Sequence, residues 1–129
     1  MKARWIIVIA VTVLLLFVGA GQLPAHHGTA SYDTSKTATV KGAVTDFQFV
    51  NPHVLVFLDA KDDKGSVQKW QGELTSPNHL VRNGWTKSSL KPGDQVTLAG
   101  FPAKSGVTSL WITKVLLADG SSLDPSVGN

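Results

Sequence analysis

The sequence predicts a small all-β domain with one short helix, arranged as a five-stranded, OB-like barrel that is partly open. Five segments rich in β-branched and aromatic residues are separated by turn signals, and one capped helical segment falls between the third and the fourth. Three strands, a helix and two further strands in this order are typical of that barrel. An all-β sandwich is the alternative, but it leaves the helix without a place.

The first strand is expected over residues 37–50, which is long for a single strand. Its apolar side chains lie on one face up to Val44 and on the opposite face from Phe47 onward. A change of face beside Gly42 predicts a bend or bulge that lets one strand serve two sides of a curled sheet. Pro52 ends the pairing, because proline has no N–H to donate to the ladder.

The other four strands follow from the same alternation of apolar and polar residues. We expect them over residues 53–60, 66–74, 95–101 and 107–117. The first of these four is apolar on both faces and is therefore expected at the centre of the sheet. A polar tip that contains Gly65 joins it to the next strand, and Pro92-Gly93 fits the centre of a type II turn.

The helix is expected over residues 77–83, about two turns. Ser76 predicts its start, because a hydroxyl caps the first turn and Pro77 follows at a position where the missing N–H costs nothing. Gly84 predicts its end, and Trp85 can pack back on the helix in the contact that accompanies a Schellman motif. We expect this ring and the other large aromatic rings in the core of so small a domain.

Residues 1–25 resemble an export signal. Lys2 and Arg4 provide a basic start, residues 5–18 are apolar apart from one threonine, and small residues precede Ala25. The alternative is an uncleaved inner-membrane anchor, because residues 5–21 approach the roughly 17–25 residues that span a bilayer. We expect a periplasmic protein. Its predicted parts are an N-terminal segment (26–36), the barrel domain (37–120) and a flexible tail (121–129).

Composition narrows the classes of function. Cleavage of the leader leaves 10 basic against 9 acidic residues, so the net charge falls from +3 to +1. Nucleic acid is not expected as a partner, because its recognition normally requires a concentrated basic patch, and a membrane is expected only if the leader is retained. The absence of cysteine excludes disulfides, thiolate metal sites and thiol catalysis.

No catalytic motif is recognisable, so we expect a protein that is not an enzyme. The chain has no Gly-x-Ser-x-Gly elbow, no Gly-rich phosphate loop and no His-Glu-x-x-His motif. Its only glutamate, Glu73, lies on the face of its strand opposite Trp70. We expect a solvated strand residue there, and a buried acid near His53 is the alternative.

The four histidines are the candidate metal ligands. If cleavage follows Ala25, the mature chain begins with a free amine on His26, and His27 comes next. The amine, the imidazoles and a further ring from His53 or His79 would form a nitrogen-rich chelate that suits copper(II). Near a helix N-terminus, His79 is favoured in the neutral form that metals require. The alternative is a disordered chain start and two ordinary surface histidines.

A second hypothesis needs no metal. Barrels of this type bind ligands on the face of their second and third strands and on adjoining loops. The residues that we expect on this surface are Phe57, Lys69, Gln71 and Trp85. The protein would then be an interaction domain in the periplasm that binds a peptide, a glycan or an envelope protein.

Several short motifs in order also indicate a family. They are His26-His27, Tyr32-Asp33, Val40-Lys41-Gly42, Asn51-Pro52-His53, Ser76-Pro77-Asn78, Gly84-Trp85 and Leu90-Lys91-Pro92-Gly93-Asp94. They resemble those of a family of small exported bacterial proteins that is classed as a domain of unknown function, and the resemblance covers roughly residues 26–123. The resemblance implies this architecture and export from the cytoplasm, and it carries over no catalytic residue.

Overall fold

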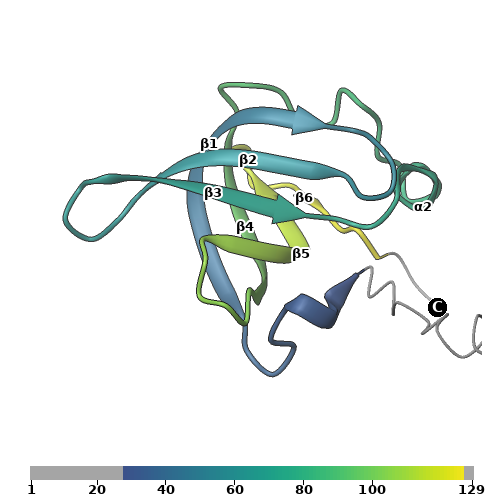
Figure 1. Cartoon of the computed structure of the whole chain (residues 1–129). Helices are drawn as coiled ribbons and strands as arrows, with labels where there is room; N and C mark the ends of the chain where they lie inside the picture. Colours follow the sequence, from purple (N-terminus) through teal and green to yellow (C-terminus); the bar gives the residue numbers. More distant parts are fainter. Residues whose placement is uncertain (1–27, 127–129) are drawn as a thin grey trace, which may run out of the picture.

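A computed structural model describes residues 28–126 as a curled β-sheet with one short helix at its end (Figure 1). The elements are η1 (Thr29–Ser31, a 3₁₀ turn), β1 (Ala38–Gln48), β2 (Leu55–Lys61), β3 (Val67–Glu73), α2 (Pro77–Arg82), β4 (Gln95–Pro102), β5 (Ser109–Leu117) and β6 (Ser122–Leu123). The predicted leader, with His26 and His27, lies outside the described residues. Within 28–126, no helix has the length and apolar character needed to cross a membrane.

A parallel contact closes the sheet into a barrel. The strand order is β3-β2-β1-β4-β5-β6, and each pair of neighbours in that order is antiparallel. In addition, β3 pairs in parallel with β5, so that Gln71 lies opposite Ser109 and Glu73 lies opposite Trp111. The predicted OB-like barrel is therefore confirmed, with α2 between β3 and β4.

The predicted bulge in the first strand is also confirmed. The register between β1 and β2 shifts between Val44 and Asp46, and β1 pairs with β4 through its first half but with β2 through its second half. Gly42 lies where both pairings overlap. A Cβ at this position would lie 2.4 Å from the backbone oxygen of Asp59, so the strands approach each other too closely for a side chain.

The core fills the interior of the barrel and extends under α2. Leu58, Leu98 and Ile112 come from three different strands, and each is at most 1% exposed. The predicted helix ends are confirmed: the Ser76 hydroxyl accepts a hydrogen bond from the backbone N–H of His79. At the other end of the helix, the backbone N–H of Trp85 donates to the carbonyl of Leu80. The helix thus closes one end of the barrel with its apolar side (Figure 1).

The prediction of a flexible tail is wrong for residues 121–126. Ser122 and Leu123 pair with β5, and the chain then passes beside the helix. The indole Nε1–H of Trp85 donates to the carbonyl of Asp124 at 3.1 Å, and the Asn83 amide donates to the carbonyl of Pro125 at 2.7 Å. A fully buried indole needs an acceptor, and this segment provides it.

We expect Gly100→Ala to lower the free energy of unfolding by about 3 kcal/mol or more, the upper range for overpacking. A Cβ at Gly100 would lie 2.0 Å from the backbone oxygen of Trp111, and backbone cannot rotate away. Gly72→Ala is the matched control, because its Cβ would meet the side chain of Ile112, which has other rotamers. Urea unfolding measures both losses. A smaller loss at Gly100 than at Gly72 would contradict the close approach.

Candidate functional site

A hydrogen-bonded polar cluster lies on the outside of the closing pair of strands. We call Tyr32, His53, Glu73, Ser109 and Trp111 the seam cluster. Tyr32 follows η1, His53 precedes β2, Glu73 ends β3, and the other two lie on β5. The parallel register of β3 and β5 brings the acid and the indole opposite each other, although they are far apart in the sequence.

Glu73 joins two other members of this cluster through its two carboxylate oxygens. Oε2 accepts a hydrogen bond from the Tyr32 hydroxyl at 2.6 Å, and Oε1 pairs with His53 Nδ1. The side chains of His53 and Glu73 are only 18% and 20% exposed. The preferred prediction of a solvated strand residue was therefore wrong, and the alternative of an acid near His53 is correct.

Tyr32 keeps its proton at neutral pH. The residue is 6% exposed, and burial together with the hydrogen bond to Glu73 raises the pKa of its phenol to about 12. Its oxygen also lies 3.2 Å from Ser109 Oγ. The protonated hydroxyl therefore donates to the Glu73 carboxylate at neutral pH, and this hydrogen bond holds Glu73 in one orientation.

The imidazole of His53 is held on two sides. Its Nδ1 faces the Glu73 carboxylate, and its ring meets Trp111 edge-on at a centroid distance of 5.4 Å and an interplanar angle of 86°. In a neutral ring, a carboxylate partner places the proton on Nδ1 and leaves the lone pair on Nε2. Within the described part of the chain, Nε2 takes part in no hydrogen bond. Among the described residues, the ring thus has one nitrogen without a hydrogen-bond partner, and its orientation is fixed by Glu73 and Trp111.

The N-terminal segment is docked beside this cluster. Tyr32 forms a β-bridge with Ala103, and the Asp33 N–H donates to the Pro102 carbonyl at 2.8 Å. Lys104 binds back to the segment, with its backbone N–H on the Ser31 carbonyl at 3.0 Å. The chain directly after the histidine pair is therefore attached to the loop between β4 and β5.

His79 does not join the seam cluster. It is exposed in the first turn of α2, and its backbone N–H donates to the carbonyl and the hydroxyl of Ser76. Among residues 28–126, no group of three or more His, Asp or Glu side chains is placed to hold a metal ion. The described residues therefore supply His53 as an oriented imidazole but not a complete coordination sphere.

Three of the four residues of the predicted ligand surface lie together. Phe57, Lys69 and Gln71 line a groove of about 390 Å³ with residues 107–109 and with Trp70, which is partly buried and packs against the core. Trp85 does not line it, because the residue is 1% exposed and packs inside the barrel. The predicted place of Trp85 on this surface is therefore wrong. A ligand role for the other three residues stays a prediction.

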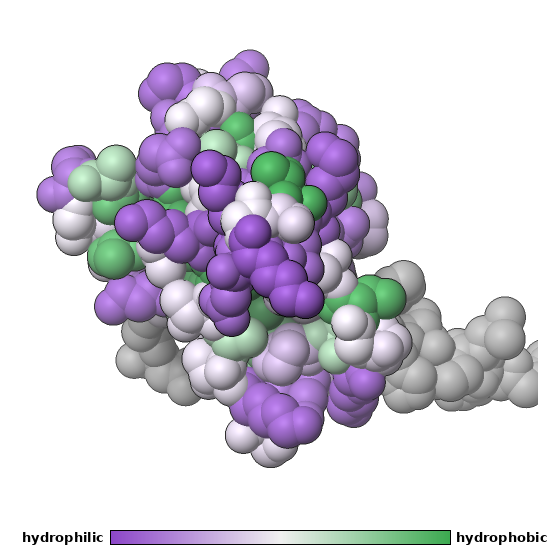
Figure 2. All heavy atoms as spheres, turned by 90° about the vertical axis from the view of Figure 1, so that its left-hand side faces the viewer, coloured by the Kyte–Doolittle hydropathy of each residue, from purple (hydrophilic) through white to green (hydrophobic). Residues whose placement is uncertain are grey.

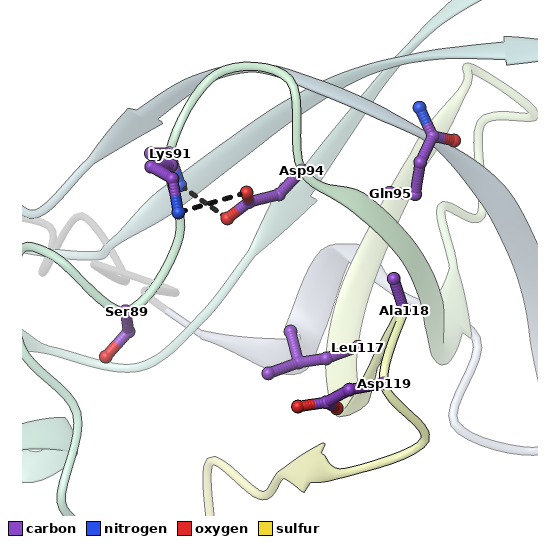
Figure 3. Close-up of a pocket in the computed structure, with 7 residues that line it drawn as sticks. All are labelled: Ser89, Lys91, Asp94, Gln95, Leu117, Ala118 and Asp119. Carbon is purple, nitrogen blue, oxygen red and sulfur yellow. Dashed lines mark hydrogen bonds and ion pairs between the residues drawn. The ribbon is translucent and has the colours of Figure 1, made fainter.

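A second hollow lies beside the start of β4 (Figure 3). It contains two carboxylates, but both already hold turns together. Asp94 accepts from the Lys91 N–H and pairs with the Lys91 ammonium group at 3.4 Å. Asp119 accepts from the hydroxyl and N–H of Ser121, which lowers the pKa of that carboxyl below its usual range. Both carboxylates therefore act as acceptors within their own turns.

We expect the phenol of Tyr32 to titrate near pH 12 in the folded protein and near pH 10 in denaturant. Tyr32 is the only tyrosine, so the ultraviolet absorbance of tyrosinate reports it alone. Because the folded state favours the protonated form, this group contributes stability below pH 10 that is lost as the pH rises through 12. Tyr32→Phe should abolish that part of the alkaline loss. Equal midpoints in both states would contradict the buried hydrogen bond.

Two solved structures are similar to part of this chain at low identity. A complex of TiaS with a transfer RNA and ATP matches with 19% identity and a TM-score of 0.48 over 67% of this chain and 19% of that chain. The mitochondrial single-stranded DNA binding protein Rim1 of S. cerevisiae matches with 10% identity and a TM-score of 0.49 over 64% and 93% of the two chains. This chain thus spans only about a fifth of the TiaS chain.

These comparisons correct the prediction about partners. The prediction excluded nucleic acid in favour of an envelope partner or a small ligand, but the solved structures that resemble this chain are a tRNA complex and a single-stranded DNA binding protein. The exclusion of nucleic acid is therefore withdrawn, and nothing in the comparisons supports an envelope partner. The similarity is too low to indicate what this chain binds.

The sequence comparison identifies the family. The chain matches none of the curated proteins. The model of the Family of unknown function (DUF6152) matches residues 14–110, which include the first four strands, the helix and four of the five members of the seam cluster. The predicted resemblance to a family of unknown function is therefore confirmed, and the chain belongs to the Family of unknown function (DUF6152).

Proposed function

We propose that this protein is an exported, non-enzymatic module that binds a divalent metal ion, preferably copper(II), through His53 together with His26 and His27. A family of unknown function and a small OB-like barrel fit a module that is not an enzyme. The observation that carries the proposal is the pairing of His53 Nδ1 with Glu73, which leaves Nε2 free.

This pairing resembles the usual surroundings of a metal-bound histidine. Such histidines almost always donate their second ring N–H to a carboxylate or carbonyl group, which selects the tautomer and raises the basicity of the ligand nitrogen. Glu73 provides the carboxylate, and the hydroxyl of Tyr32 in turn orients Glu73. The indole of Trp111 restricts the ring further. The imidazole of His53 therefore has the orientation that metal binding requires without a metal present.

The remaining ligands come from the chain start. His27 precedes Tyr32 by five residues, and Tyr32 binds the same carboxylate as His53. An extended chain covers about 3.3–3.6 Å per residue, so His27 lies within about 18 Å of Tyr32 along the chain. After cleavage at Ala25, the free amine of His26 adds another nitrogen. Nitrogen donors in a tetragonal arrangement favour copper(II), which also stands highest in the divalent affinity order.

We expect the protein that begins at His26 to bind one equivalent of copper(II) tightly in a calorimetric titration. Acetylation of the α-amine of His26 should weaken binding at least about tenfold, because it removes the terminal nitrogen donor, and even the loss of an outer-shell partner has an effect of this size. Unchanged affinity in the acetylated protein would exclude the terminal chelate. No binding by the unacetylated protein would overturn the metal function as a whole.

His53→Ala should lower the copper(II) affinity at least about tenfold, since it removes a ligand nitrogen. His79→Ala is the matched control, because His79 is exposed on α2 and outside the seam cluster, so its loss should leave the affinity unchanged. Circular dichroism confirms that both variants fold before titration. Equal losses in the two variants, or a loss only at His79, would count against His53 as the ligand.

A further inference from the structure

Asn83 and Gly84 form the one Asn-Gly pair in the chain. The backbone nitrogen that follows an asparagine can attack the side-chain amide, and glycine hinders this attack least because it has no side chain. The Gly84 nitrogen then bonds to Cγ of Asn83, the bond from Cγ to Nδ2 breaks, and ammonia leaves with the proton of the attacking nitrogen. Water opens the resulting succinimide ring to aspartate or isoaspartate, and its proton returns to the nitrogen.

The end of α2 holds the attacking nitrogen out of reach. Gly84 has a φ of 83°, and its N–H donates to the Val81 carbonyl at 3.1 Å. Together with the bond from the Trp85 N–H to the Leu80 carbonyl, this is a Schellman motif. The ring closure requires the Gly84 nitrogen and the Asn83 Cβ on the same side of the Cα–C bond, and a ψ of 17° at Asn83 holds them apart. The reaction therefore requires the helix end to open first.

The tail, residues 121–126, holds the side chain that would react. The Asn83 amide nitrogen donates to the carbonyl of Pro125 at 2.7 Å, so the leaving group is itself in a hydrogen bond. The indole of Trp85 donates to the carbonyl of Asp124 beside it. Pro125 is buried and Leu123 packs against the core, which fixes both carbonyls in place.

These contacts lie at the end of the barrel that carries α2 (Figure 1). Figure 2 shows the other end of the molecule, where hydrophilic residues dominate and apolar residues form small separate groups. Asn83 bonds to α2 through its backbone and to the tail through its side chain. A chemical change of that side chain therefore acts first on the contact with the tail.

We infer that Asn83 is a site of spontaneous deamidation, that the end of α2 and the tail keep it unreactive, and that its conversion removes a hydrogen bond that docks the tail. The product places a carboxylate oxygen opposite the Pro125 carbonyl, where the amide nitrogen donated before. Two acceptors then face each other without a proton between them. Isoaspartate also lengthens the main chain by one carbon atom at the helix end.

The first test compares the folded protein with the same chain in urea, both kept in mildly alkaline buffer. Trypsin releases residues 83–87, in which mass spectrometry quantifies the deamidated form. We expect Asn83 to react at least about tenfold more slowly when folded, because each of the two hydrogen bonds that must open contributes a few-fold. Asn78 is the internal control: it precedes the larger His79 and should react slowly in both samples. Equal rates at Asn83 in the two samples would overturn the inference.

Leu123→Ser tests the part that the tail plays. It removes an apolar side chain that packs against the core, so the folded protein should deamidate at Asn83 about threefold faster or more. Ser122→Ala is the matched control, because Ser122 is the exposed neighbour in β6 and its loss should leave the rate unchanged. Circular dichroism verifies that both variants fold. The same rate in Leu123→Ser as in the unaltered protein would exclude protection by the tail.

Asn83→Asp tests the effect of the product directly. The indole N–H of Trp85, which donates to the Asp124 carbonyl, should exchange with solvent several-fold faster in this variant when followed by NMR, because the neighbouring bond to the tail is lost. Asn78→Asp is the matched control, since Asn78 is exposed on the same helix and makes no contact with the tail among the described residues. Indole exchange at the same rate in Asn83→Asp and in the unaltered protein would refute the loss of docking.

Discussion

The parallel pairing of β3 with β5 is the constraint on which the rest of the structure depends. Without it, the sheet would stay open, with two exposed edges and an apolar face that no second layer covers. Closure joins the end of β3 to the start of β5 and encloses Leu58, Leu98 and Ile112. The long first strand makes closure possible, because its bulge lets it pair with β4 along one half and with β2 along the other.

The pairing of β3 with β5 also assembles the seam cluster on the outside of the barrel. Side chains alternate along β3, so the register that turns Gly72 inward against Ile112 also turns Glu73 outward beside Trp111. His53 and Tyr32 then reach the carboxylate from two other segments. Among the described residues, no buried side-chain nitrogen or oxygen lacks a hydrogen-bond partner, so a largely buried carboxylate is compatible with a stable fold.

The fold does not decide the function of this protein, because one fold carries many unrelated functions and the family itself is of unknown function. Function therefore has to be argued from particular groups. Here, the proposed metal function rests on the imidazole of His53, which the Glu73 carboxylate orients.

The sequence by itself determined the local elements. Alternating apolar residues located the five main strands, Ser76-Pro77 and Gly84 located the helix, and the change of face after Val44 located the bulge, because each of these signals acts between near neighbours. Only the tertiary structure decided which residues far apart in the chain meet. The link from His53 through Glu73 to Tyr32, the partial exposure of Trp70 and the docking of the tail on Trp85 all depend on how the barrel closes. No local pattern encodes that closure, because its register is set by the combined packing of every strand around one core.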